Sequence, residues 1–353
     1  AIDYDGKTYT ADVAVPSLPA LHAVFKRGEL AIFGAFTIPA GGGALTYNDG
    51  LPYLIPLITF VKDPTGPTPK DGVFSGSSIF YGVTVGAAYR LFGKLSVAVA
   101  GRAVLANKAF SGHATYGDVK AELDTTKQAM GFAPILGLTI KPGFGVTLAA
   151  RYEGAAAMEF TAKTKTVNMK GAADWQGTAL ESFVDGAKEQ RDMPATLGLG
   201  AAWTGKGITV STSFHAYMTK AADSAKDYAG VPGTGGLGAY SKSWDDDYED
   251  GWDVALAVEY QVTDALLLST GAVRASLGGS KDTLNDFEQA LDSDSVCGGV
   301  RYTLNKRLKL TAAVSRTFYK DDSNEALVPL VYPSPETYRK RVFDLAVGVQ
   351  YSF

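Results

Sequence analysis

The sequence ends in Arg341-Val-Phe-Asp-Leu-Ala-Val-Gly-Val-Gln-Tyr-Ser-Phe353, and this stretch decides the fold. Phe343 and every second residue after it are apolar or aromatic, while Asp344 and every second residue after it are small or polar. A period of two separates side chains into two different faces only in a β-strand. A long strand with an open apolar face and a terminal aromatic residue suits a barrel in a bilayer, which is apolar outside and polar or small inside.

The composition of the 353 residues fits such a barrel and excludes several other classes. Hydrophobic residues make up 46% and charged residues 20%, so disorder is not expected. No window approaches the roughly 20 apolar residues of a spanning helix. The single cysteine, Cys297, excludes a disulfide framework and a Cys-rich metal site, and the net charge of -4 offers no basic surface for nucleic acid.

We predict no cofactor, no metal site and no catalytic residue. An enzyme would need an arranged nucleophile and base. The histidines, His22, His113 and His215, have no neighbouring serine motif that forms a triad.

Upstream of the final strand, two alternating strands joined by a short polar turn recur six times. All the short turns would lie at one end of a barrel and all the long loops at the other, which is the periplasmic-turn and extracellular-loop asymmetry of outer-membrane barrels. The predicted turns are Lys26–Glu29, Leu91–Lys94, Lys141–Gly143, Thr204–Gly207, Val262–Asp264 and Asn305–Arg307. The predicted long loops are 40–76, 111–127, 163–191, 220–249, 278–292 and 321–337. The sequence therefore predicts an all-β, antiparallel, up-and-down transmembrane barrel in the bacterial outer membrane, as a single domain over residues 1–353.

The strand count predicts one strand more than the sequence shows. Six hairpins and the last strand make thirteen, whereas single-chain bacterial barrels normally have an even number. The final strand runs toward the short-turn end, and so does the first visible strand at 17–26. We therefore expect a fourteenth strand before Ala1 that pairs with Arg341–Phe353, and we interpret residues 1–16 as its outer loop. Phe353 would suit recognition by the barrel-assembly machinery.

The stretch Val15–Pro52 resembles the FadL/TodX-type outer-membrane transporters, which take up long-chain fatty acids and other hydrophobic compounds. The resemblance is carried by the hairpin that ends in Pro39-Ala-Gly-Gly-Gly43 and by Tyr47-Asn-Asp-Gly-Leu-Pro52. Beyond this stretch only the architecture agrees. The resemblance implies a fourteen-stranded barrel, an N-terminal hatch in the lumen, and an inward kink of the third strand that opens a lateral exit. Neither the hatch nor its Asn-Pro-Ala-type motif is visible in the sequence.

The kink implied by the resemblance falls on one short stretch. With the missing strand counted as the first, the third strand runs from Leu30 to Pro39. It breaks at the residues that we predict as the lateral opening, Pro39, Gly41, Gly42 and Gly43. Proline cannot donate a ladder hydrogen bond, and glycines permit bulges and bends. An ordinary strand end that enters a loop explains these residues equally well.

Two groups of residues are candidates for ligand binding. The apolar loop segment 51–61 would be costly in water unless it packs on the barrel mouth or binds lipid, and both alternatives stay open. Arginines on the lumenal face could pair with a fatty carboxylate, although such residues more often form Arg–carboxylate ladders that brace a barrel. The predicted ligand-binding residues are Leu51, Tyr53, Leu54, Ile55, Leu57, Phe60, Arg102, Arg151 and Arg301.

The leading functional hypothesis is passive uptake of hydrophobic molecules, foremost long-chain fatty acids, by lumenal binding and lateral release. A general porin and a structural or adhesin barrel are the alternatives. The expected partners are a hydrophobic small molecule, outer-membrane lipid and lipopolysaccharide, and the barrel-assembly machinery at the final strand. We expect a monomer.

Overall fold

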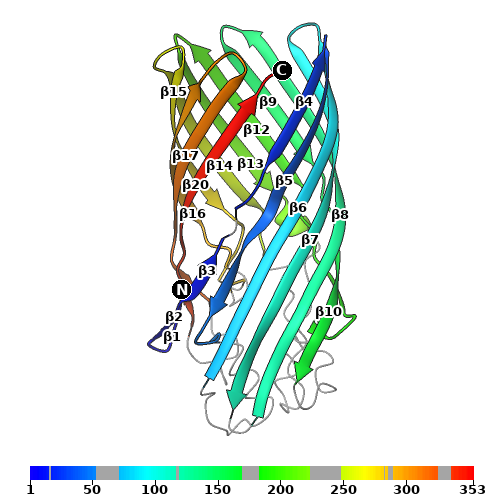
Figure 1. Cartoon of the computed structure of the whole chain (residues 1–353), viewed down its shortest axis with the longest axis vertical. Coiled ribbons are helices and arrows are strands. Elements are labelled where there is room, and N and C mark those ends of the chain that lie inside the picture. The colour runs from blue at the N-terminus through cyan, green and yellow to red at the C-terminus, as the bar shows by residue number, and fades with distance from the viewer. Residues whose placement is uncertain are drawn as a thin grey trace.

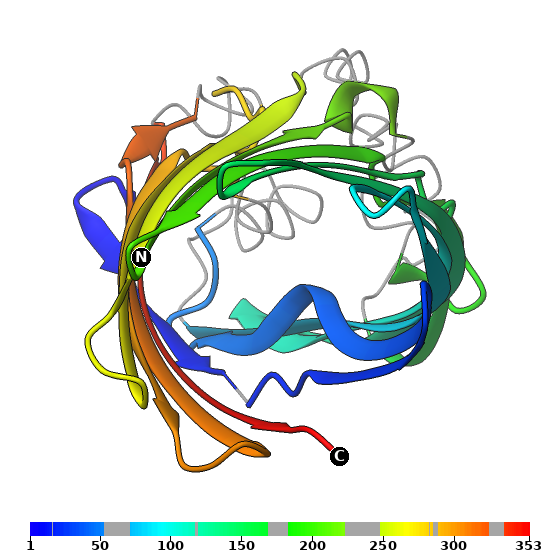
Figure 2. The same cartoon turned by 90° about the horizontal axis from the view of Figure 1, so that it is seen from above.

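The computed structural model describes residues 1–15, 17–52, 71–116, 119–168, 183–222, 248–281, 283–284, 289–324 and 335–353. Most of them lie in tilted antiparallel strands arranged around a lumen (Figure 1, Figure 2). No helix in these residues is long and apolar enough to cross a membrane. The elements are β1 (Ile2–Tyr4), β2 (Lys7–Tyr9), β3 (Ala11–Ala14), β4 (Leu21–Arg27), β5 (Leu30–Tyr47), β6 (Asp71–Leu91), β7 (Leu95–Tyr116), β8 (Val119–Gly143), β9 (Val146–Glu153), β10 (Glu159–Asn168), β11 (Lys188–Gln190), β12 (Thr196–Gly205), β13 (Ile208–Tyr217), the 3-10 helix η3 (Thr219–Ala221), β14 (Gly251–Gln261), β15 (Leu266–Ser276), β16 (Ser293–Thr303), β17 (Leu308–Tyr319), β18 (Asp322–Ser323), β19 (Thr337–Tyr338) and β20 (Arg341–Tyr351).

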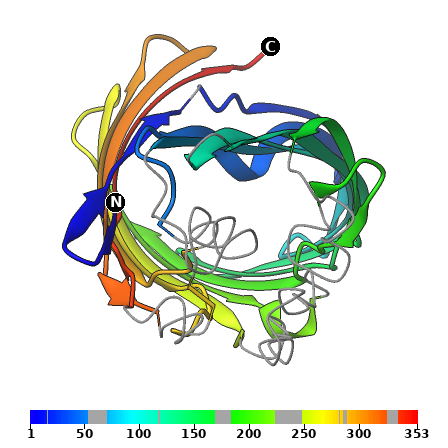
Figure 3. The ribbon, with the colours of Figure 1, turned by 90° about the horizontal axis from the view of Figure 1, so that it is seen from below.

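Among the described residues, thirteen strands follow one another around the wall in the order β20-β17-β16-β15-β14-β13-β12-β9-β8-β7-β6-β5-β3. β4 continues the line of β3 along β5, and β10 continues the line of β9 along β8. The predicted number of visible strands is therefore confirmed. Within the described residues, β20 pairs only with β17, and β3 and β4 pair only with β5, so β20 faces them across a seam that is visible in Figure 3.

The outward face of the wall is apolar. On β20, Phe343, Leu345, Val347, Val349 and Tyr351 are between 60% and 82% exposed. Such a contiguous apolar surface is tolerated when lipid covers it, because transfer of apolar area out of water contributes about 25 cal/mol per Å². The predicted all-β transmembrane barrel is therefore confirmed.

The apolar band ends well before the long strands do. On β7 the outward side chain changes from exposed Leu105 to exposed Asn107, and on β8 it changes from Met130 to Gln128. The remaining parts of β7 and β8 extend past the band toward the long-loop end. Residues beyond these points therefore lie outside the membrane-spanning part of the barrel.

These extensions correct the predicted loops. The predicted loop 111–127 is wrong, because β7 pairs with β8 in register from Leu95 to Tyr116. The predicted loops 40–76 and 163–191 are too long, because β5 continues to Tyr47, β6 begins at Asp71 and β10 ends at Asn168. Small and polar side chains dominate these strand ends, so they lack the apolar alternation on which the prediction rested.

The first residues also differ from the prediction. Residues 1–16 were expected to be an irregular loop, yet they contain β1, β2 and β3. The β1–β2 hairpin turns at Asp5 and Gly6, whose φ angles of 45 and 75 degrees are those of a type I′ turn. An Asp-Gly dipeptide is a strong hairpin signal, and it was present in the sequence. The strand predicted at 17–26 begins only at Leu21.

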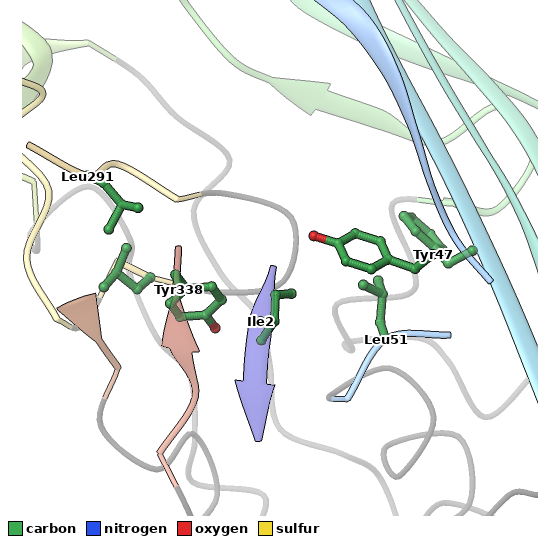
Figure 4. Packing of buried hydrophobic residues seen from close by; sticks show 7 residues of the cluster. Ile2, Tyr47, Leu51, Leu291 and Tyr338 are labelled. Carbon is green, nitrogen blue, oxygen red and sulfur yellow. The ribbon is translucent and has the colours of Figure 1, made fainter. Parts of the chain in front are cut away.

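A small four-stranded sheet, β18-β19-β1-β2, joins the two sides of the seam at the long-loop end. The amino group of Ala1 donates to the carbonyl oxygen of Arg339 at 2.8 Å. Beneath this sheet lies a buried cluster that connects it to β5 and β6 (Figure 4). The cluster consists of Ile2, Tyr47, Leu51, Phe74, Leu284, Leu291 and Tyr338. These packed side chains therefore connect the two sides of the seam at the long-loop end.

Candidate functional site in the barrel lumen

Strand β5 is kinked where the glycine triplet occurs. Its register with β6 shifts twice, between Thr37 and Ala40 and between Gly41 and Gly43. Each extra residue bulges the strand and bends it, and Figure 2 shows β5 swinging toward the lumen. Because β5 continues to Tyr47, the alternative of an ordinary strand end at Pro39 is wrong.

Glycine is required at the centre of this kink. Gly41 has a φ of 73 degrees, and a Cβ there would lie 2.4 Å from the carbonyl oxygen of Ser78. Gly42 has a φ of 123 degrees, a conformation essentially restricted to glycine. These glycines therefore determine where β5 bends, because other residues rarely adopt this backbone conformation.

Within the described residues, the kinked part of β5 lacks a ladder partner on the side away from β6. β3 stops pairing with β5 at Ala14 and β4 starts at Leu21, so residues 37–43 have no strand partner there within the described residues. The side chain of Leu18 occupies this interval instead, because a Cβ on Gly42 would lie 3.0 Å from its Cδ2 atom. Among the described residues, the side chain of Leu18 therefore covers Gly42 where the strand ladder is interrupted.

Pro39 brings the kink against a charged group in the lumen. A Cβ on Gly82 would lie 3.1 Å from Cδ of Pro39 and 3.4 Å from Cδ of Arg102. Arg102 donates from Nε to Oγ1 of Thr84 at 3.1 Å, and its Nη1 lies 2.7 Å from Oε1 of Glu153. The guanidinium beside the kink is therefore already held by protein groups.

The other two predicted arginines also face carboxylates. Arg151 donates to Glu153, which thus joins Arg102 and Arg151 in one cluster. Arg301 lies on β16 with its Nη2 3.9 Å from Oε2 of Glu259. The structure brings the first two predicted arginines together and leaves the third apart. This arrangement is that of an Arg–carboxylate ladder, the alternative to ligand binding.

The predicted outer segment is only partly described. Leu51 is fully buried in the cluster under the small sheet, which suits a loop that packs on the barrel mouth. The remaining predicted residues of this segment, Tyr53, Leu54, Ile55, Leu57 and Phe60, lie outside the described residues.

An apolar cluster that the sequence did not reveal is buried inside the barrel beside the kink. Phe80, Val104, Ala106, Met158 and Phe160 are each at most 8% exposed, and Ala40 of the kink packs against them. Met158 lies just before β10 and Phe160 at its start, and the later part of β10, residues 163–168, had been assigned to a loop. The alternation of Met158, Phe160 and Ala162 with Glu159, Thr161 and Lys163 could have identified this strand.

A charged cluster, made of Lys108, Lys127, Glu189 and Arg191, follows the apolar cluster toward the long-loop end. Lys108 and Lys127 are cross-strand neighbours on β7 and β8. Lys127 is 4% exposed and donates to Glu189, which also lies 4.0 Å from Arg191. Lys108 places its Nζ 4.9 Å from the centre of the Phe160 ring. Apolar and charged surfaces therefore adjoin in the lumen.

His215 belongs to a hydrogen-bonded group on the opposite wall. Its Nδ1 lies 2.9 Å from Oδ1 of Asp253, and Tyr217 donates to the other carboxylate oxygen at 2.5 Å. No hydrogen bond from a serine or cysteine to His215 occurs in the described part of the chain. The group cross-links β13 and β14.

No protein-family model matches the chain, and no curated protein matches its sequence. Solved structures do match it. A FadL homologue from Pseudomonas aeruginosa superposes with a TM-score of 0.65 at 14% identity, covering 95% of this chain and 78% of that chain. The toluene transporter TodX from P. putida gives 0.60 at 14% identity, covering 97% and 87%. The chain therefore shares its fold with FadL/TodX-type outer-membrane transport proteins.

Proposed function

We propose that the protein is a bacterial outer-membrane channel for the passive uptake of hydrophobic molecules, with long-chain fatty acids as the leading substrate class. The observation that carries this proposal is the kink of β5, which places Ala40 against the lumenal apolar cluster. At this point the described residues form no ladder on the side of β5 away from β6. The structures that share the fold include a FadL homologue and a toluene transporter, which supports the same function.

The route would run from the lumen sideways into the bilayer. An acyl tail would insert among Phe80, Met158 and Phe160, and would leave through the interval between β5 and Leu18. Lateral release keeps the tail out of water, and each buried CH₂ contributes about 0.8 kcal/mol. Diffusion down a gradient of free ligand then needs no energy source. Pro39, Gly41, Gly42 and Gly43 would form the opening in this proposal.

The apolar lumenal cluster favours this function over the two alternatives. A general porin works through an aqueous channel with a polar interior. A structural or adhesin barrel needs no apolar surface beside an interruption of the wall. Five nearly buried apolar side chains in the lumen, next to a kink that only glycine permits, fit a hydrophobic route better.

Outer-membrane vesicles with and without the protein provide the test. Uptake of radiolabelled oleate and ion conductance would be measured on the same preparation. We expect oleate uptake that depends on the protein and follows the oleate gradient, with little ion conductance. Ion conductance without oleate uptake would establish a porin instead, and absence of both would favour the structural barrel.

A further inference from the structure

Strands β17 and β20, which lie next to the seam in Figure 1, each carry an arginine on their lipid-facing side. Arg316 alternates on β17 with the exposed side chains of Val314 and Phe318. Arg341 precedes the exposed Phe343 by two residues on β20. Arg316 is directly opposite Phe343 in the ladder, so these two side chains share one face of the sheet. Both arginines are exposed and therefore lie on the outer surface of the wall.

These arginines lie at the outer edge of the lipid-facing band. β20 has 11 residues and runs from Arg341 to Tyr351, which is at the short-turn end. A rise of about 3.4 Å per residue and a tilt of about 40 degrees place these two residues about 26 Å apart along the membrane normal. The lipid-facing band of such barrels is about 25 Å tall. Arg341 therefore lies at the outer interface, and Arg316, its diagonal neighbour on β17, lies about 7–8 Å away.

The surroundings of Arg316 and Arg341 leave their charges uncompensated. Within the part of the chain that the structure describes, neither arginine forms an ion pair, and the Cζ atom of Arg316 lies 5.7 Å from the centre of the Phe318 ring. Three neighbouring cations, in contrast, each have a carboxylate partner. These pairs are Arg274 with Asp294 at 3.8 Å, Lys320 with Asp292 at 3.4 Å, and Arg339 with Asp3.

A lipid-facing arginine is stabilised when the membrane supplies the missing anion. A cationic side chain on this face of a barrel costs about 2–4 kcal/mol at the middle of the bilayer and about 0–1 kcal/mol near its interfaces. The long apolar stem of arginine lets the guanidinium reach the interface. The planar guanidinium then pairs with a phosphate through two parallel hydrogen bonds. Two such groups on adjacent strands therefore suit a lipid phosphate.

We propose that Arg316 and Arg341 bind a phosphate group of lipopolysaccharide, while Phe318 and Phe343 contact its acyl chains. The long loops of outer-membrane barrels lie on the extracellular side, so lipid at this end belongs to the outer leaflet. The phosphates of lipopolysaccharide complement the two uncompensated charges. This proposal rests on the outer-membrane location contained in the proposed function, and it is independent of uptake through the lumen.

The test compares lipopolysaccharide with the same lipopolysaccharide after chemical removal of its phosphates. Both are titrated against the full chain in detergent micelles. The double variant Arg316→Leu/Arg341→Leu places apolar side chains on the lipid-facing surface, and Arg307→Leu is the control, because Arg307 is exposed in the turn before β17 at the opposite end of the barrel. We expect the wild-type protein to bind the phosphorylated form at least about tenfold more tightly, or about 1.4 kcal/mol. The double variant should lose this preference, and Arg307→Leu should keep it.

Two further measurements use the same proteins. The preference for the phosphorylated form should weaken as salt is raised from about 0.1 M to about 1 M, because exposed charges are then screened within about 3 Å. Native mass spectrometry of protein extracted from outer membranes should show lipopolysaccharide bound to the wild-type protein and to Arg307→Leu, and less of it bound to the double variant. Bound phospholipid in place of lipopolysaccharide would overturn the proposal.

The remaining outcomes separate this site from the uptake function. Equal affinities of the wild-type protein for the two forms, or an unchanged phosphate preference in the double variant, would overturn the site and leave oleate uptake untouched. Absence of oleate uptake with the phosphate preference intact would refute the channel alone. Absence of the protein from outer membranes would refute both. If the double variant does not fold, Arg316→Leu and Arg341→Leu are tested singly by the same criteria.

Discussion

Substitution of Arg102 by methionine should separate a bracing role from a ligand-binding role. The side chains of Arg102 and Glu153 are 17% and 10% exposed and approach to 2.7 Å. Breaking a buried ion pair by removing one partner costs about 3–5 kcal/mol. Since Arg151 still holds Glu153, we expect the lower end of that range, about 3 kcal/mol, for Arg102→Met.

The assay is chemical unfolding in detergent, combined with oleate titration of the folded protein. A double-mutant cycle with Glu153→Gln isolates the pair, and the double variant should be less destabilised than the sum of the single variants. Oleate affinity should change less than about twofold. Unchanged stability of Arg102→Met together with lost oleate binding would refute the bracing role and make Arg102 a ligand residue.

Two further outcomes follow from the kink. Leu18→Ala should speed oleate uptake and Leu18→Trp should slow it, whereas the control Leu21→Trp on the paired strand β4 should leave the uptake rate unchanged. Uptake rates of both Leu18 variants equal to the wild-type rate would remove Leu18 from the route. Gly41→Ala should destabilise the barrel by more than Gly93→Ala in unfolding assays. Both glycines have a positive φ, but of these two only Gly41 would place its new Cβ 2.4 Å from a carbonyl oxygen. Equal losses of unfolding free energy in the two variants would argue against the packed kink.

The sequence correctly predicted those parts of the strands in which one face meets lipid. The alternation of Arg341–Phe353 has a direct cause, since one face of β20 meets hydrocarbon and the other meets the lumen. The same cause makes the six hairpins visible. It also makes each of the thirteen strands recognisable in the sequence, because each strand must cross the same apolar band.

The lumenal site could not be predicted in the same way. Once β7 and β8 pass the band, no lipid selects apolar residues, so the strand ends at 111–116 and 119–127 looked like a loop. The cluster of Lys108, Lys127 and Glu189 unites residues from three strands, and no spacing in the sequence links them. The predicted arginines faced the lumen, as their parity indicated, but parity could not show that carboxylates already hold them.

Photo-crosslinking with a fatty acid that carries a diazirine in its tail tests the central claim most directly. The probe would be bound to the protein in outer-membrane vesicles, irradiated, and its attachment sites mapped by peptide sequencing. We predict labels on the lumenal residues Phe80, Met158 and Phe160 and on the segment around Leu18, with competition by unlabelled oleate. Labels confined to lipid-facing side chains such as Val347, and insensitive to oleate, would contradict lumenal binding and lateral release.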